Sequence, residues 1–371
     1  ALQAKVEDVH VYGLKVDGSG FTGSFGGLLG NVSVMSKVSA CSVEDAVVSL
    51  PASESVGGLC ASLRTSSSVV ASKFGGSMVA KSALGGIAGE VYENGGLSSI
   101  TDCHVDAALT AEHTIGGIVG SDNHNEIARN RVEGSLTATT GSKWSGPCIG
   151  GIVGVLEMMN AGKVAGNVVC LDALNFTPVE GGSVRYETAH RIAGQTVYNE
   201  TGTETDNGLA ANYVEESLSP VSTQSAYAGA EGAEGESIAR GSLTTDFFKT
   251  LGYGYGASAP SPWKGDALPR LYFEGETRGL VAVTTQLELR ALAAGEVLFL
   301  APGGSCDDIT VSVADDGVIE VAYIESRNEG KVVAFDALKP GVTTITARCG
   351  DYTAQCVVTV QGAGASGIDL V

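Results

Sequence analysis

A diglycine followed by an aliphatic residue recurs along the first half of the chain at nearly constant spacing. Five copies occupy residues 25–30, 56–60, 84–89, 115–120 and 149–154, and a degraded sixth occupies residues 191–194. The second glycines of the five copies follow one another at intervals of 31, 28, 31 and 34 residues. A unit this thin buries no apolar face of its own. The repeat therefore predicts a solenoid, in which each unit stacks on its neighbours.

A second pattern recurs between the diglycines. In each copy a small or polar residue is followed by alternating apolar residues, which is typical of a strand. Its small residues are Cys41, Ser72, Cys103, Asn130 and Asn167. Each unit therefore holds at least two short strands, and these residues are expected to form a ladder along the stack. Coils stack ~4.8 Å apart, so Cys41 and Cys103, two coils apart, lie beyond disulfide reach. We expect no disulfide between them.

Charge and composition exclude several classes of partner. The chain of 371 residues has a formal net charge of −20, which disfavours nucleic acid and anionic membrane surfaces as partners. Its 52 glycines follow no collagen-like period, and no apolar run is long enough for a membrane span. The first residues do not resemble a signal peptide, so we expect a processed or trimmed chain.

The pattern Gly-Gly-[Leu/Ile]-x-Gly resembles the GLUG motif of bacterial surface and secreted proteins over about residues 5–195. Residues 243–252, with Trp263 and residues 268–271, resemble the segment that closes such repeats. The resemblance implies a right-handed parallel β-helix and a surface or adhesion role, and it implies no catalytic residues.

The segment after the repeat has a different composition. Residues 227–236, rich in Gly, Ala and Glu, have the composition of a linker. Thr245 and Asp246 precede two phenylalanines and predict the N-cap of one short helix. An open solenoid end exposes strand edges, so we expect Phe248, Leu251 and Trp263 to cover that end.

From about residue 279 eight strand-like runs follow one another at the spacing of a β-sandwich. Residues 338–347 and 356–360 resemble the end of the bacterial Ig-like domain of group 2, which implies a spacer or adhesion module. Around a turn at Gly350, Cys349 is expected to face Tyr352, and Cys356 to face Ile345. A bond from Cys306 to Cys349 or Cys356 stays open.

Motifs for chemistry are few. The polar loop 122–126 has oxygen ligands suitable for calcium, but it matches no known calcium-binding repeat, and a solvated turn is the simpler interpretation. A polysaccharide lyase or glycosidase on a β-helix needs carboxylates, or a basic residue, on neighbouring coils. The residues placed for such a role are Asp102, Asp106, Arg129, Arg131 and Glu133.

Together these observations predict an all-β chain: a right-handed parallel β-helix followed by an Ig-like sandwich. The expected division is 1–200 for the repeats, 201–278 for an irregular linker and cap, 279–362 for the sandwich, and 363–371 for a tail. The expected function is non-enzymatic adhesion at a bacterial surface or in the medium, through an extracellular protein or glycan. A carbohydrate-active enzyme and a structural stalk are the alternatives. We expect no catalytic, cofactor-binding or metal-binding residues, no nucleic acid, no membrane insertion, and a monomer.

Overall fold

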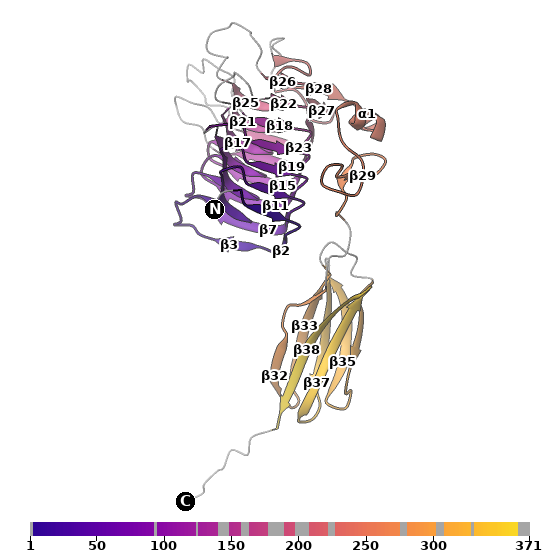
Figure 1. The fold of residues 1–371 in the computed structure, drawn as a ribbon. Helices are drawn as coiled ribbons and strands as arrows, with labels where there is room; N and C mark the ends of the chain where they lie inside the picture. Colours follow the sequence, from indigo (N-terminus) through magenta and orange to yellow (C-terminus); the bar gives the residue numbers. More distant parts are fainter. Residues whose placement is uncertain are drawn as a thin grey trace, which may run out of the picture. The chain divides into compact units, whose positions relative to one another are not determined.

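The structure is a computed structural model that describes residues 3–92, 95–123, 125–139, 148–156, 163–176, 189–196, 208–221, 227–274, 280–301, 308–327 and 330–362. His124 of the polar loop and Cys306 lie outside the described residues. The chain divides into two compact units, Ala1–Tyr272 and Phe273–Val371. The first unit is a β-solenoid built from four parallel sheets, A to D, and a middle coil adds one strand to each sheet (Figure 1). The sequence predicted at least two strands per unit, and the structure has four.

Sheet A has seven strands, each paired in parallel with the equivalent strand of the next coil. They are β1 (Lys5–Glu7), β6 (Lys37–Ser39), β10 (Ser68–Val70), β14 (Ser99–Thr101), β18 (Glu126–Ala128), β22 (Lys163–Ala165) and β26 (Leu209–Ala210).

Sheet B has nine strands, and its longer strands lie one above another in Figure 1. They are β2 (His10–Tyr12), β3 (Lys15–Asp17), β7 (Ser42–Leu50), β11 (Lys73–Ala80), β15 (His104–Ala111), β19 (Arg131–Ala138), β23 (Val168–Phe176), β27 (Tyr213–Glu215) and β28 (Glu236–Ile238).

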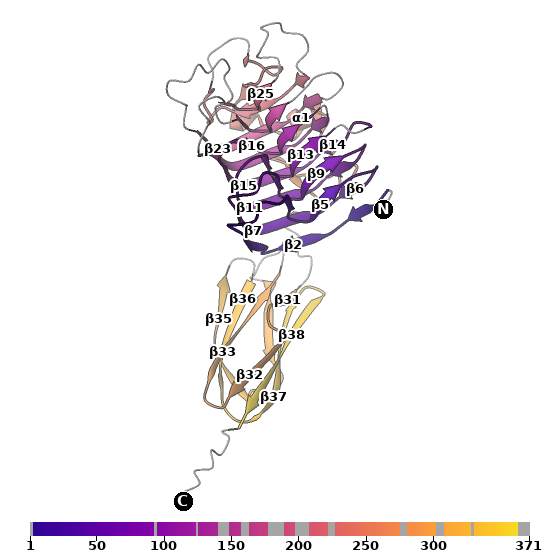
Figure 2. The ribbon, with the colours of Figure 1, turned by 90° about the vertical axis from the view of Figure 1, so that its left-hand side faces the viewer.

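Sheets C and D carry the diglycine motif, and Figure 2 shows strands of sheet D stacked in the same way. Sheet C consists of β4 (Phe25–Gly26), β8 (Val56–Gly57), β12 (Leu84–Gly85), β16 (Thr114–Gly116), β20 (Cys148–Gly150) and β24 (Ala189–His190). Sheet D consists of β5 (Leu29–Val32), β9 (Cys60–Arg64), β13 (Ala88–Tyr92), β17 (Val119–Asp122), β21 (Val153–Leu156) and β25 (Ala193–Thr196).

The core is a set of apolar rows that run along the stack. Equivalent strands pair in register, apart from shifts at Phe74/Gly76 and Gly134/Ser135 of sheet B, so an inward side chain meets its equivalent one coil away. One row in sheet A is Val38, Val69, Ile100, Ile127, Val164 and Leu209, all buried. One row in sheet B is Val43, Phe74, Val105, Val132, Val169 and Val214, all buried. Branched aliphatic residues suit such strands because they pack on a pleated surface.

The glycines of the motif allow backbone to approach backbone where sheets C and D meet. A Cβ on Gly117 would overlap the carbonyl oxygen of Gly151 in the next coil. A Cβ on Gly120 would lie 2.7 Å from the Leu84 nitrogen in the preceding coil, which is too close for any real side chain. The glycines of the repeat are therefore explained by the lack of space for a side chain between stacked coils, and not by flexible turns.

Arg191 supports this interpretation, because it stands where the sixth copy would have its second glycine. Strand β24 is the last strand of sheet C, so no strand of that sheet follows it. A side chain is tolerated there because the steric requirement ends with the row.

The predicted ladder is present at the turn between sheets A and B. The Cys41 N–H donates to Ser72 Oγ at 3.2 Å, and the Cys103 N–H donates to Asn130 Oδ1 at 2.9 Å. The Asn130 N–H donates to Asn167 Oδ1 at 3.0 Å, and Asn212 extends the series by one coil. Neither Cys41 nor Cys103 forms a disulfide, as predicted. The ladder satisfies backbone donors that the turn would otherwise leave buried without partners.

Two predictions about the region after residue 200 are wrong. Strands β26, β27 and β28 continue sheets A and B, so the solenoid extends beyond residue 200. The segment predicted to be a linker covers the end of the stack instead, where the Ile192 N–H donates to the Ala233 carbonyl at 2.9 Å. Glu234 is buried there, 2.8 Å from His190 and 3.1 Å from Arg191. Its small Ala and Gly residues permit this close packing, which composition alone does not distinguish from a flexible linker.

The predicted short helix is present as α1 (Thr245–Thr250), although Thr244 is its N-cap and accepts from the Phe247 N–H at 3.3 Å. It belongs to a segment, residues 240–272, that we call the strap, which also contains η3 (Arg240–Ser242), β29 (Trp263–Lys264) and β30 (Arg270–Leu271). The prediction that Phe248, Leu251 and Trp263 cover the open end is wrong, because the strap packs on the side of the stack. It is held there because acceptors at the A–B turn face outward in the middle coils.

The second unit consists of two four-stranded sheets around one core. The first sheet contains β31 (Val281–Ala282), β33 (Ala294–Leu300), β36 (Gly330–Ala337) and β35 (Ile319–Arg327) in that order. The second contains β32 (Gln286–Arg290), β38 (Tyr352–Gln361), β37 (Gly341–Cys349) and β34 (Thr310–Val313). Phe299 and Phe335 of one sheet and Ile345 and Val358 of the other share the core. Cys349 faces Tyr352 and Cys356 faces Ile345, as predicted.

Replacement of a stacking glycine tests the steric account. Gly120→Ala is expected to destabilise the solenoid by about 1–3 kcal/mol, because its Cβ meets backbone rather than flexible side chain. Gly30→Ala is the matched control: it stands at the same place in the motif, in the first copy, and its Cβ would have no heavy atom within 4 Å. The measurement is urea unfolding of both variants. Equal midpoints for the two variants would contradict the account.

Candidate functional site on sheet B

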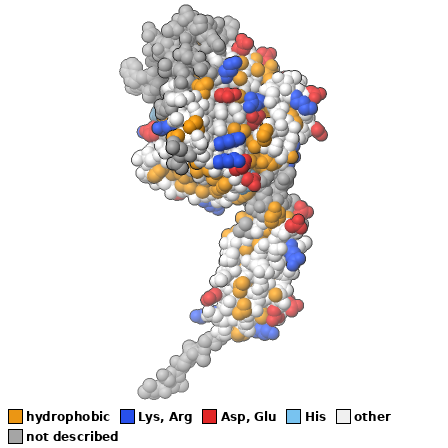
Figure 3. All heavy atoms as spheres, in the orientation of Figure 1, with side chains coloured by type: hydrophobic (Ala, Val, Ile, Leu, Met, Phe, Trp, Pro, Cys, Tyr) orange, Lys and Arg blue, Asp and Glu red, His pale blue; other side chains and the backbone are white. Residues whose placement is uncertain are grey.

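The outer face of sheet B carries a basic row beside an acidic row. Lys73, His104 and Arg131 are register partners on successive coils. Asp106 and Glu133 are partners in the neighbouring row. Figure 3 shows Lys and Arg side chains close to Asp and Glu side chains on this face. Parallel stacking produces the arrangement, because residues two apart on a strand point to the same side and repeat coil after coil.

A buried cluster occupies the middle of these rows. Arg131 Nη2 lies 2.9 Å from Glu133 Oε2 and 2.6 Å from His104 Nε2. The side chain of Arg131 is 2% exposed. His104 Nε2 is also 3.1 Å from Glu133 Oε2, so it donates to the carboxylate or accepts from the guanidinium according to its tautomer. Burial raises the pKa of Glu133, but its contacts with His104 and Arg131 outweigh burial, and the net pKa is lowered.

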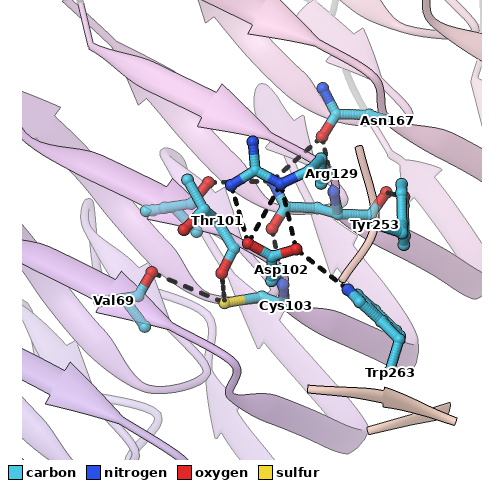
Figure 4. Close-up of polar contacts among 10 residues, drawn as sticks. Val69, Thr101, Asp102, Cys103, Arg129, Asn167, Tyr253 and Trp263 are labelled. Atoms are coloured by element: carbon cyan, nitrogen blue, oxygen red, sulfur yellow. Dashed lines mark hydrogen bonds and ion pairs between the residues drawn. The ribbon is translucent and has the colours of Figure 1, made fainter. Parts of the chain in front are cut away.

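A second cluster anchors the strap at the A–B turn. Arg129 holds Asp102 with three hydrogen bonds, of which the shortest is 2.8 Å, and Trp263 Nε1 donates to Asp102 Oδ1 at 3.0 Å. Tyr253 donates its hydroxyl proton to the Asn130 carbonyl at 3.0 Å. Figure 4 shows Arg129 and Trp263 converging on Asp102. The Asp102 carboxylate is thus committed to structure.

Aromatic rings continue this anchor along the strap. Trp263 packs on Tyr253, Tyr253 on Phe248, and Phe248 on Phe247, with ring centroids 5.0, 5.0 and 5.5 Å apart. Trp263 and Phe248 are fully buried. The pairs of Phe248 with Tyr253 and with Phe247 are edge-to-face, an arrangement that adds about 0.5–1.5 kcal/mol for each pair beyond burial. The strap therefore has a defined position on the solenoid.

Between the strap and sheet B lies an open groove of about 640 Å³. Arg131 and Glu133 of β19 contribute from the sheet. The strap contributes Arg240, Leu243, Gly265, Asp266, Ala267, Leu268 and Arg270. Arg240 is held by Glu215 of β27 at 2.6 Å. Asp266 and Arg270 are exposed.

The five residues considered for a carbohydrate-active enzyme therefore separate into three groups. Asp102 and Arg129 bind each other under the strap, whereas Arg131 and Glu133 pair at the groove. Asp106 is exposed on the neighbouring coil. Arg240, Asp266 and Arg270 were not predicted, because they lie outside the repeat and no pattern relates them to β19.

In the polar loop considered for calcium, Asp122 and Asn125 are buried, whereas Glu126 is exposed. Asp122 occupies a core row of sheet D, in register with Val91, and its carboxylate accepts from the Asn125 side chain at 2.9 Å. Asn125 belongs to a second ladder, in which its Oδ1 accepts from the Ser98 N–H at 2.8 Å. Among the described residues, no three His, Cys, Asp or Glu side chains are grouped as metal ligands.

The thiols near these sites are poorly suited to nucleophilic chemistry. Burial raises the pKa of Cys60 and of Cys148 to about 12. It also raises the pKa of Cys170, the register partner of Glu133, to about 12. A thiol acts as a nucleophile in its thiolate form, which these values suppress at neutral pH.

Comparison with known proteins adds little. No family model matches the sequence. No curated protein matches it either. Among solved structures, surface layer protein SbsC, domains 1–6, is similar with a TM-score of 0.21 and 15% identity over 24% of this chain and 13% of that chain. A likeness of this size carries no argument about function. In the described part of the chain, no helix has the length and apolar character needed to cross a membrane.

Loss of the Asp102 anchor is expected to loosen the strap. Asp102→Ala removes the acceptor for Trp263 Nε1 and the partner of Arg129, so we expect a loss of about 2–4 kcal/mol and a red-shifted Trp263 emission. A Trp144→Phe background makes Trp263 the only tryptophan. Asp106→Ala, an exposed Asp on the next strand, is the control and is expected to change neither quantity. Unchanged emission in Asp102→Ala would contradict the anchor.

The lowered pKa of Glu133 predicts a pH-dependent contribution to stability. Because the folded pKa lies below the unfolded value near 4.3, the contribution is present above that value and is lost as pH falls through the folded pKa. Glu133→Gln is expected to cost about 1 kcal/mol at pH 7 and less at pH 3.5. Urea unfolding at both pH values measures it, with the exposed Glu126→Gln as control. A difference that does not depend on pH would refute the prediction.

Proposed function

We propose that this chain is a non-enzymatic, adhesin-like protein that binds an extracellular glycan or protein through the groove beside sheet B. One observation carries the proposal: where the groove meets sheet B, Arg131 and Glu133 are already paired with each other, and Arg240 is paired with Glu215. Such a surface offers fixed donors and acceptors for recognition.

The resemblances in the sequence support the same conclusion. The GLUG-like repeat implies a right-handed parallel β-helix at a bacterial surface or in the medium. The Ig-like resemblance of the second unit implies a spacer that carries the binding unit. We infer a monomer, since a solenoid with its own core and a covered end stands without a partner.

The arrangement of the carboxylates favours binding over catalysis. A glycosidase or lyase needs an acid or base free to exchange its proton with substrate. Glu133 is held ionised by Arg131 and His104, and Asp102 is held by Arg129 and Trp263. Release of Asp102 would free Trp263 of the strap, and release of Glu133 would leave Arg131 without its carboxylate partner.

A binding screen with a parallel activity readout tests the proposal. The full chain is applied to arrays of glycans and extracellular matrix proteins, and the same glycans are analysed for depolymerisation. We expect saturable binding of at least one ligand and no change in glycan length. Depolymerisation would replace the proposal with the enzyme alternative. Absence of any binding would favour a structural stalk.

A further inference from the structure

The groove is lined by ionisable side chains of both signs. Its guanidinium groups are Arg131, Arg240 and Arg270, and its carboxylates are Glu133 and Asp266. Glu215, bonded to Arg240, adds a third carboxylate. The lining itself has one excess positive charge, which Glu215 offsets through its ion pair with Arg240, so the groove has little net charge to select an ion.

Arg131 is held in a fixed position on the sheet side of the groove by its contacts with Glu133 and His104. Its side chain is 2% exposed, yet its Nε is a buried donor with no hydrogen-bond partner among the described residues. A buried donor left without a partner costs about 1–3 kcal/mol, and an acceptor that reached Nε through a small side-chain movement would offset that cost. Glu133 beside it holds a carboxylate with a lowered pKa, which remains an acceptor at neutral pH.

Aliphatic surface lies beside these polar groups. Leu243, Ala267 and Leu268 line the groove from the strap, and no aromatic ring lines it. The combination of paired donors and acceptors with aliphatic surface matches a molecule that carries hydroxyl groups at its edges and C–H groups on its faces.

An extended peptide fits this groove less well. Peptides that bind along sheets pair with an exposed strand edge. Strand β19 is hydrogen-bonded to β15 on one side and to β23 on the other, so its backbone offers no free edge. An anionic polymer is disfavoured as well, because the chain as a whole carries a formal net charge of −20.

We propose that the groove between sheet B and the strap binds a neutral oligosaccharide through hydroxyl contacts with Arg131, Glu133, Asp266 and Arg270. The inference rests on the proposed function and narrows its ligand class. The next coil has Val168 and Cys170 at the positions of Arg131 and Glu133, so the polar contacts are confined to β19 and the strap. The strap restricts the site to the coils that it covers.

Calorimetry with defined oligosaccharides tests the inference. The full chain is titrated with neutral hexasaccharides of glucose, mannose, xylose and N-acetylglucosamine, and with a galacturonate hexamer as the anionic counterpart. We expect binding of a neutral hexamer, with an affinity that differs little between 0.05 and 0.5 M NaCl, because no charge on the ligand is screened. Preferential binding of the galacturonate hexamer, weakened by salt, would overturn the inference.

Variants locate the site. Asp266→Ala and Arg270→Ala alter exposed strap residues, and together they are expected to weaken binding by roughly tenfold or more. Asp246→Ala and Lys249→Ala are the matched controls: they remove one acid and one base from α1, away from the groove lining, at side chains 95% and 54% exposed. The controls are expected to bind within about twofold of the parent chain.

The outcomes separate this inference from the proposed function. Neutral-sugar binding that survives Asp266→Ala and Arg270→Ala would overturn the groove as the site and leave the adhesin proposal standing. Binding of a matrix protein in the screen, without binding of any sugar, would have the same effect. Absence of binding to every glycan and protein would overturn both.

Discussion

Close approach of backbone to backbone, made possible by a missing Cβ, is the constraint on which the solenoid depends. At Gly117 and Gly120 the neighbouring coils leave no room for a side chain, and the neighbours are carbonyl and amide groups that have no space to yield. In sheets C and D the backbones of neighbouring coils therefore approach one another more closely than a residue with a Cβ would permit. Equivalent residues of sheets C and D pair in register coil after coil, and the apolar rows of sheets A and B align as well, with bulges in sheet B at β11 and β19. Arg191 replaces glycine only where the row ends.

The polar architecture follows from that register. Identical turns stacked in register bring one backbone donor per coil to the same place, and the Ser and Asn side chains of the ladder accept from these donors. Asp102 and the Asn130 carbonyl are the acceptors that this turn exposes in the middle coils, and Trp263 and Tyr253 dock on them. The docked strap then forms one wall of the groove, and β19 contributes the surface opposite. The candidate binding site is thus a consequence of how the turns stack.

Much of the fold could be predicted because the same local pattern occurs in every coil, so each copy supports the interpretation of the others. The coil spacing, the ladder and the separation of Cys41 from Cys103 all follow from the period. The site could not be predicted, because Arg131 belongs to the repeat while Arg240, Asp266 and Arg270 do not. No periodic pattern relates such residues. The linker interpretation of residues 227–236 was wrong for a similar reason, since small residues that pack tightly and small residues in a flexible linker have the same composition.

The sequence by itself determined that the chain is a β-solenoid with stacked coils, followed by a separate all-β unit. Glycine at fixed intervals and alternating apolar residues suffice for this, because both express contacts between equivalent positions. Only the tertiary structure decided where the strap docks, what covers the end of the stack, and which charged residues form ion pairs with one another. Those outcomes depend on contacts between positions far apart in the sequence, such as Asp102 with Trp263 and Arg191 with Glu234. Such contacts leave no local signature in a single sequence.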